Sequence, residues 1–347
     1  MIKEKMLRKK ALAILLALVM LAAMLPIAAS AESADYATAY IGITSDVHGS
    51  DTNVAAWMDN NGGSTLMYMV FGGDTGSMYW KTGSGTNELG TVSTGTSYSS
   101  DGDQTWKRIT DRIAESYPDT TPLFTMGNHD WWIGSTSTYN NADLLSFQPI
   151  TGQARTGVMN DPAADGFTIY TFGAPGTSYS FKQSDIDDLS AALSASDPGE
   201  PFLIISHYPL HYGDGRTSSN AGSIINLLND YAITNNSNKI FFFWGHNHHW
   251  SSNTAQMNKI SVPGDTIVPS DEPSTTKTIY FTYANSGHMG VEHNNAARDG
   301  TGELVAITDN GSTTSVTLSL NEKDGTTITT KTVDIEAVGG EISSVSI

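Results

Sequence analysis

The stretch TPLFTMGNHDWW, residues 121–132, joins a short apolar run to a turn that carries an amide, an imidazole, a carboxylate and two indoles. Leu123–Met126 is predicted to be a buried strand, and Gly127-Asn128-His129-Asp130 follows it directly. Polar side chains at the end of a buried strand are costly unless they are hydrogen-bonded or bind a ligand. The turn therefore indicates a functional site.

Four other apolar runs end in the same way. The five predicted strands are 40–44, 66–71, 123–126, 202–205 and 240–244, and they are followed in turn by Asp46-Val47-His48, Asp74, Asn128-His129-Asp130, His207 and His246-Asn247-His248. In an open α/β sheet the carboxyl ends of parallel strands converge on one crevice, where ligands bind. We expect these side chains to meet at one sheet edge.

The spacing between these strands favours α/β architecture. Amphipathic helices are predicted over 106–117, closed by Pro118, and over 184–193 and 224–231, and a further buried strand over 167–172. Continuous apolar strands of this kind are typical of sheets covered on both faces. The Gly/Ser/Thr-rich segment 75–103 is predicted to be a long loop, either functional or loosely ordered.

The sequence pattern changes after Lys277, where predicted strands follow one another without intervening helices. Short strands are predicted over 278–283, 304–308, 314–320 and 327–333, separated by turn signals such as Asp309-Asn310-Gly311. This β meander is either a second sheet of the same domain or a small separate domain. We favour the first, because no proline-rich or charged linker precedes it.

The collected polar residues suit metal ions. Imidazole and carboxylate without sulfur suit Zn, Fe or Mn better than Ca or Mg. Two Asp, one Asn and four His are too many ligands for one ion that keeps an open position, but they suit two ions that share a carboxylate, as in phosphoryl transfer. Taken alone, each motif has an ordinary alternative, a casual surface histidine tract or a plain turn. Their joint occurrence, each after a strand, favours the metal site.

The N-terminal sequence and the composition indicate where the protein is located and which partners it can bind. Residues 1–31 have the basic, apolar and small-residue regions of a signal peptide cleaved after Ala31, which predicts a secreted protein without a membrane span in its mature chain. That leader holds five of the 18 Lys and Arg and one of the 36 Asp and Glu, so the mature chain has 13 against 35, a net charge of −22. Such acidity disfavours a stable nucleic-acid complex. The absence of cysteine excludes disulfides and thiol chemistry.

In their order, the motifs resemble the calcineurin-like metallophosphoesterase family. Its five blocks, D-x-H, G-D, G-N-H-D/E, H and G-H-x-H, match 46–48, 73–74, 127–130, 207 and 245–248. The resemblance implies a four-layer α/β/β/α sandwich with mixed sheets, spanning 32–336 and followed by a tail over 337–347. In such a sandwich the C-terminal meander would be part of the second sheet.

The resemblance also implies roles for individual residues. One metal would be held by Asp46, His48 and His248, the other by Asn128, His207 and His246, with Asp74 bridging the two. A hydroxide between two Mn, Fe or Zn ions would attack the phosphorus. His129 would donate a proton or hydrogen bond to the leaving oxygen and be oriented by Asp130.

Several neighbours of these motifs stay open. Trp131 and Trp132 either floor the leaving-group side or pack under the loop. His211 and Arg216 follow His207 on a predicted site loop, where Arg216 is a candidate phosphate ligand. His249 is assigned to the surroundings of the site or to the surface. His288 and His293 have no assigned role.

Departures from relatives narrow the function. Purple acid phosphatases have glycine where this chain has His48, and the tyrosine they use to hold iron is missing. Too few residues follow Gly290 for the C-terminal domain of secreted 5′-nucleotidases. We expect a secreted enzyme that hydrolyses phosphomonoesters or small phosphodiesters. The alternatives are a non-catalytic extracellular metal-binding or adhesion protein, and a phosphodiesterase acting on nucleic acid or phospholipid headgroups.

Overall fold

The computed structural model describes residues 37–76, 102–132, 147–176, 178–213, 217–248, 254–290 and 300–336, and four short strands between 78 and 100. The predicted signal peptide 1–31, the tail 337–347 and most of the segment 75–103 lie outside the described residues. Within that segment β3 (Met78–Tyr79) pairs with β6 (Ser99–Ser100), and β4 (Thr86–Asn87) pairs with β5 (Gly90–Thr91). None of the described helices has the length and apolar character to span a bilayer.

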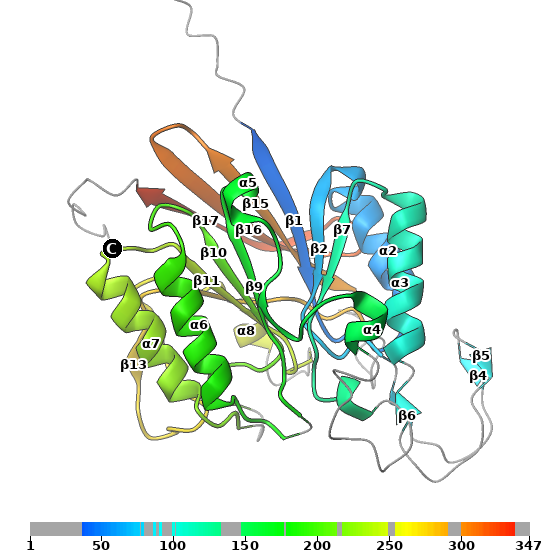
Figure 1. The fold of residues 1–347 in the computed structure, drawn as a ribbon, viewed down its shortest axis with the longest axis horizontal. Coiled ribbons are helices and arrows are strands. Elements are labelled where there is room, and N and C mark those ends of the chain that lie inside the picture. The colour runs from blue at the N-terminus through cyan, green and yellow to red at the C-terminus, as the bar shows by residue number, and fades with distance from the viewer. Residues whose placement is uncertain are drawn as a thin grey trace, which may run out of the picture. The chain divides into compact units, whose positions relative to one another are not determined.

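The first sheet has six strands in the order β17-β16-β15-β1-β2-β7 (Figure 1). They are β1 (Thr38–Thr44), β2 (Leu66–Phe71), β7 (Thr121–Phe124), β15 (Thr301–Asp309), β16 (Thr313–Glu322) and β17 (Thr327–Glu336). β1, β2 and β7 run parallel, whereas β15 pairs antiparallel with β1 and leads into an antiparallel β16 and β17. The last three strands of the predicted meander thus extend the sheet that β1 begins, and do not form part of the other sheet.

The second sheet has five strands in the order β14-β11-β10-β9-β8. They are β8 (Thr156–Val158), β9 (Thr168–Phe172), β10 (Phe202–Ser206), β11 (Ile240–Trp244) and β14 (Thr282–Asn285), all parallel except β8. The strand predicted over 278–283 was wrong in its bounds. Its start is β13 (Lys277–Thr278), which pairs with β12 (Thr266–Ile267), and its end belongs to β14, parallel to β11.

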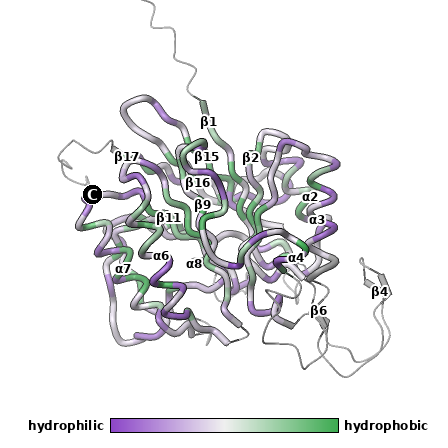
Figure 2. Tube along the Cα trace, viewed as in Figure 1, coloured by the Kyte–Doolittle hydropathy of each residue, from purple (hydrophilic) through white to green (hydrophobic). Residues whose placement is uncertain are grey.

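The two sheets stack face to face, and helices cover their outer faces. In β10, Leu203 and Ile205 point into the core between the sheets, while Phe202 and Ile204 pack under the helices α6 (Gln183–Ala195) and α7 (Ala221–Thr234). On the first sheet, Trp57 of α2 (Asp51–Asn60) and residues of α3 (Gly102–Ser116) cover β2. Because every central strand is buried on both sides, its sequence is apolar at consecutive positions. Figure 2 shows these strands as the hydrophobic interior.

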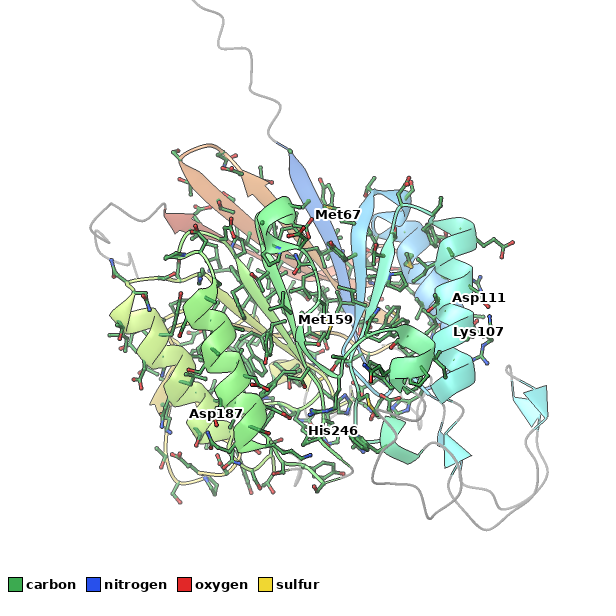
Figure 3. The ribbon with its side chains drawn as sticks, viewed as in Figure 1. Met67, Lys107, Asp111, Met159, Asp187 and His246 are labelled. Carbon is green, nitrogen blue, oxygen red and sulfur yellow. The ribbon has the colours of Figure 1, made fainter. Side chains whose placement is uncertain are left out.

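The predicted four-layer α/β/β/α sandwich is therefore confirmed, from α2 and α3 through both sheets to α6 and α7. Figure 3 shows the polar outer faces of these layers, with Lys107 and Asp111 on α3 and Asp187 on α6. The remaining described elements are short: η1 (Gly63–Thr65), η2 (Asp130–Trp132), α4 (Gln148–Thr151), α5 (Pro162–Asp165) and α8 (Thr254–Met257).

Candidate metal centre

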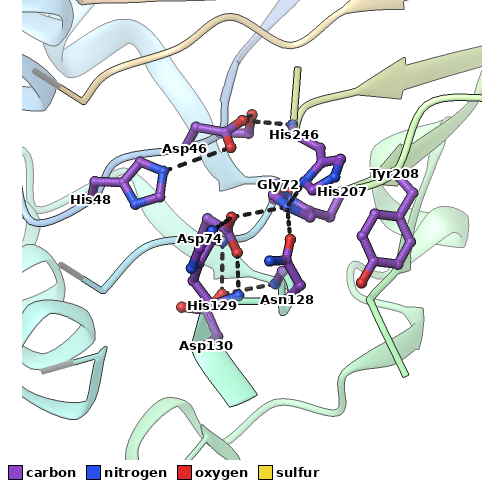
Figure 4. A network of polar contacts seen from close by, with 12 residues as sticks. Asp46, His48, Gly72, Asp74, Asn128, His129, Asp130, His207, Tyr208 and His246 are labelled. Carbon is purple, nitrogen blue, oxygen red and sulfur yellow. Dashed lines mark hydrogen bonds and ion pairs between the residues drawn. The ribbon is translucent and has the colours of Figure 1, made fainter. Parts of the chain in front are cut away.

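Five strand ends bring the predicted site residues together, but the strands belong to two sheets and not to one. Asp46, Asp74 and Asn128 follow β1, β2 and β7 of the first sheet, whereas His207 and His246 follow β10 and β11 of the second. Since both sheets end their parallel strands on the same side of the molecule, the polar side chains face one another there (Figure 4).

The first group consists of Asp46, His48 and His248, whose ligand atoms all lie within 4.8 Å of one another. His248 Nε2 is 2.9 Å from Asp46 Oδ1 and 3.1 Å from His48 Nε2, and His48 Nε2 is 3.9 Å from the same carboxylate oxygen. Ligands that bind one ion at roughly 2.0–2.2 Å are separated from one another by about 3 Å or somewhat more. The three side chains therefore fit a shared cation.

The second group consists of Asp74, His207 and His246, which meet the same criterion. His207 Nε2 lies 3.1 Å from Asp74 Oδ2, 3.2 Å from His246 Nδ1 and 3.1 Å from Asn128 Oδ1. The other ring nitrogen of His207 is 3.0 Å from the Gly72 carbonyl, to which it can donate. Such a second hydrogen bond orients a metal-binding imidazole.

Asp74 carries the clearest sign of a missing partner. Its Oδ1 accepts the His129 backbone N–H at 2.8 Å, whereas its buried Oδ2 meets no hydrogen-bond geometry and faces two ring nitrogens, His207 Nε2 at 3.1 Å and His129 Nε2 at 3.6 Å. Buried carboxylate oxygens are normally hydrogen-bonded or bound to a metal. A cation beside Oδ2 would satisfy this atom.

The backbone at the centre is strained in a consistent way. Four of the predicted ligands, Asp46, His48, Asp74 and His246, have positive φ values of 50°, 46°, 51° and 70°. Non-glycine residues adopt this region at a cost, and they cluster where a functional geometry requires it. Backbone hydrogen bonds from Asp46 to Gly73 and from His48 to Asp74, each 3.0 Å long, hold the first two turns together.

Two glycines of the motifs are required by close approach. A Cβ atom on Gly127 would lie 2.1 Å from Asp74 Oδ1, and one on Gly245 would lie 2.0 Å from Ser45 Oγ. Ser45 Oγ in turn donates to Asp46 Oδ2, which also accepts the His246 backbone N–H at 2.8 Å. A side chain at either glycine would displace a predicted metal ligand.

Asp130 makes hydrogen bonds that the sequence did not predict. Its Oδ2 accepts the backbone N–H groups of Asp74 and Gly127 at 2.7 and 2.8 Å, and its Oδ1 accepts those of Thr75 and Gly76 at 3.1 and 3.2 Å. These four bonds tie the turn after β2 to the turn after β7. An orienting role of Asp130 toward the His129 ring does not follow from them.

His129 stands at the rim of the centre. Its side chain is 16% exposed, its Nε2 lies 3.6 Å from Asp74 Oδ2, and its ring packs edge-on against His48. Burial lowers the pKa of His129 to about 4, although Asp74 opposes this, so the ring is neutral at pH 7. A neutral imidazole here serves as a hydrogen-bond donor more readily than as an acid.

The buried groups of the centre are strongly coupled by charge. Burial alone would raise the pKa of the Asp74 carboxyl, but His207 and His129 outweigh it and hold that pKa well below its usual range. Asp46 behaves in the same way, with His248 as the main opposing group. Burial lowers the pKa of His207, but Asp74 outweighs this and raises it to about 9. Without a cation, a proton on His207 thus balances Asp74.

Some residues next to the motifs have structural roles, and others lie outside the described part of the chain. Trp131 is buried and donates its indole N–H to the Ala174 carbonyl at 2.8 Å, so it packs under the loop. His211 is also buried, and its Nδ1 lies 2.8 Å from the Tyr283 hydroxyl. His249, His293 and Arg216 lie outside the described residues, as does the Trp132 side chain.

One histidine that the sequence left unassigned lies at the centre. The His288 ring stacks on His248 with centroids 4.6 Å apart and planes 25° apart. His288 follows β14, whose carboxyl end lies beside that of β11. Its position after a strand was the signal in the sequence, but no motif marked it.

Comparisons with known proteins agree with this picture. The profile of the calcineurin-like phosphoesterase family matches residues 39–250. No curated protein matches the chain. Among solved structures, a conserved uncharacterized protein from Streptococcus pneumoniae TIGR4, described as a predicted phosphoesterase, is 11% identical with a TM-score of 0.33, covering 86% of this chain and 98% of its own.

A single mutant of Vps29 from Entamoeba histolytica is likewise 11% identical, with a TM-score of 0.31, covering 85% of this chain and 98% of its own. Neither likeness is strong enough to bear on what this chain does. The family profile is different, because it spans more than half of the chain and includes all five motifs.

Proposed function

Since the chain belongs to the calcineurin-like phosphoesterase family, we propose that it is a phosphoric ester hydrolase that holds two metal ions, Mn, Fe or Zn, and acts on phosphomonoesters or small phosphodiesters. The observation that carries the proposal is the pair of three-residue groups, Asp46 with His48 and His248, and Asp74 with His207 and His246. Two compact sets of imidazole and carboxylate ligands suit two ions side by side.

Asp74 is the residue we assign to both ions. It lies in the second group, its Oδ1 is fixed by the His129 backbone N–H, and its buried Oδ2 faces His207 Nε2 at 3.1 Å. Asn128 completes the second set through its Oδ1, 3.1 Å from His207 Nε2. When bound, such cations lower the pKa of water and neutralise phosphoryl oxygens.

His129 is the residue we assign to the leaving group. It comes from the same turn as Asn128, and its ring is partly exposed and close to Asp74. Because the pKa of His129 is low, its ring is neutral at pH 7. It therefore donates a hydrogen bond to the departing oxygen and does not act as a charged acid. Asp130 accepts four backbone N–H groups, and these hydrogen bonds hold this turn against the turn after β2.

The substrate we propose is small and phosphorylated. A mature net charge of −22 repels long polyanions, which argues against nucleic acid as the substrate. We also propose that the protein is secreted, on the basis of the basic and apolar stretches of residues 1–31.

Hydrolysis of p-nitrophenyl phosphate and of its bis ester by the Mn²⁺-loaded protein tests the proposal. We expect the protein to hydrolyse at least one of the two esters and a chelator to abolish this turnover. The ratio of the monoester rate to the diester rate identifies the preferred ester class. Asp111→Asn, on the outer face of α3, is a matched control that leaves turnover unchanged. A wild type that holds metal yet turns over neither ester contradicts the proposal and favours a metal-binding protein without catalysis.

A further inference from the structure

A tyrosine that no motif contains packs against the metal centre from a loop of the second sheet. β9 runs parallel to β10 along its full length, with Phe172 opposite Ser206, so the chain after Phe172 leaves the sheet at the edge where His207 lies. Tyr179 stands in this loop. Its ring centroid is 4.6 Å from that of His246, with the planes at 60°.

Backbone hydrogen bonds anchor the described residues of the loop that carries Tyr179. At its start, the Ala174 N–H donates to the Met126 carbonyl at 2.7 Å, beside the Gly127 turn. The Tyr179 carbonyl accepts the Ser219 N–H at 3.0 Å. The ring therefore occupies a defined place beside the second metal group.

The neighbouring tyrosine shows what a structural phenol does here. Tyr208 is buried and also touches His246, with centroids 5.2 Å apart, and its hydroxyl contacts the carbonyls of Gly176 and Ser178 at 3.2 Å each. Its hydrogen-bonding capacity is used in fixing the loop. It packs edge-on against Tyr179 and so supports that ring as well.

The Tyr179 hydroxyl is not used in this way. The side chain is only partly buried, its described contacts are those of its ring with His246 and Tyr208, and its hydroxyl takes part in no hydrogen bond among the described residues. A phenol is both a donor and an acceptor, and a donor beside a phosphate site makes a strong, charge-assisted bond to a phosphoryl oxygen. We propose that Tyr179 is a substrate-binding residue, whose ring rests on His246 and whose hydroxyl donates to a phosphoryl oxygen of the bound ester.

This role rests on the proposed function, since it assumes that a phosphate group occupies the centre. It gives the chain a neutral donor for the phosphate on the side of the second metal group, where Tyr179 contacts His246. A bond made to the transferring phosphoryl group stabilises the transition state at least as well as the bound ester. Removing it should lower kcat/KM and weaken the binding of inorganic phosphate together.

The experiment compares Tyr179→Phe with the wild type after Mn²⁺ loading and removal of free metal. We expect an unchanged metal content, about tenfold weaker binding of inorganic phosphate by calorimetry, and about tenfold lower kcat/KM for p-nitrophenyl phosphate. Tyr68→Phe is the control: it removes a phenol hydroxyl that donates to Asp165 near the start of β2, so phosphate affinity should change less than twofold once the protein is loaded.

Each other outcome is decisive as well. Equal phosphate affinity in Tyr179→Phe and the wild type overturns the proposal, and so does the loss of a metal ion in that variant, which would mean that the hydroxyl supports the metal site and does not bind phosphate. A wild type that binds no phosphate also overturns it. If the wild type binds phosphate but hydrolyses neither ester, the proposed hydrolase function fails, while the phosphate affinities of the two variants still decide the role of Tyr179.

Discussion

Two buried acids, Asp130 beside the metal centre and Glu303 on β15, show two ways in which this chain treats a carboxyl group removed from water. Asp130 accepts four backbone N–H groups. Glu303 is equally buried, yet neither of its oxygens accepts a hydrogen bond from a described residue. Burial raises the pKa of both, but in Asp130 the N–H groups of Gly127 and Gly76 oppose the rise.

The difference separates polarity that builds the site from polarity that only costs stability. A buried acceptor with several donors holds its surroundings in one geometry, whereas one without donors retains its desolvation penalty. Changes at the two positions should therefore alter the free energy of unfolding with opposite signs. Asp74, whose Oδ2 faces His207 Nε2 at 3.1 Å, is the intermediate case, because we propose that metal ions compensate its charge.

The largest effect is expected from Asp74→Asn. The amide lacks the negative charge shared by the two proposed ions, so we expect the protein to lose at least one ion and about a thousandfold in kcat/KM, roughly 4 kcal/mol. Metal analysis and ester hydrolysis, run beside Asp111→Asn, check this. Full activity in Asp74→Asn would remove the distinction drawn between Asp74 and Glu303.

Asp130→Asn is expected to destabilise the protein by about 3 kcal/mol. An amide offers one acceptor oxygen and turns an N–H₂ group toward two of the four backbone donors, which leaves them unsatisfied. Urea unfolding with a chelator present measures this without a contribution from metal. The control is Asp161→Asn, an exposed residue with no side-chain cap bond at the start of α5, which should stay within about 0.5 kcal/mol of the wild type. A similar value for both variants would show that the four bonds contribute little.

The same contrast explains what the sequence could and could not predict. Asp46, Asp74, His207 and His246 could be placed close together because each follows a buried strand, and the fold class was predictable from the order of the motifs. The division of those strands between two sheets was not, because motif order does not specify which strands pair. The task of Asp130 was hidden for a related reason: the bonded N–H groups of Asp74, Thr75 and Gly76 lie 54 to 56 residues away.

His288 and Tyr179 were missed because they touch the centre through ring contacts, which leave no spacing in the sequence. The prediction of one strand over 278–283 was wrong because a run of β-forming residues does not show where pairing changes. The chain pairs with β12 in β13 and with β11 in β14. Export and the native substrate stay predictions.

Glu303→Gln is expected to be more stable than the wild type, and increasingly so as the pH rises. The native Glu303 stays neutral because its folded pKa is raised, while the unfolded chain ionises this group above about pH 4.5. The wild type therefore loses stability as the pH rises from about 4.5 toward the raised pKa of the folded state, and the variant does not. Above about pH 4.5 the gain in the free energy of unfolding should therefore grow as the pH rises, which urea unfolding of both proteins at several pH values measures. A gain that does not change with pH would mean that Glu303 is ionised in the fold.

His211 gives the smallest effect and the opposite slope. Burial lowers the pKa of His211 to about 4, so below pH 6.5 the unfolded chain takes up a proton that the native chain does not. The wild type should lose about 1 kcal/mol relative to His211→Asn between pH 7 and 5.5, with chelator present in both unfolding series. Parallel pH dependences in the two proteins would show that His211 titrates normally in the fold.

The central claim is that two cations lie where the parallel strands of both sheets end, one in each three-residue group. The metal content of the desalted, loaded chain tests it most directly. We predict about two ions per wild-type chain, about one in His48→Ala, which removes a ligand from the first group, and about one in His246→Ala, which removes one from the second. A wild type that retains no more than one ion, or two variants that both retain two, would contradict the account.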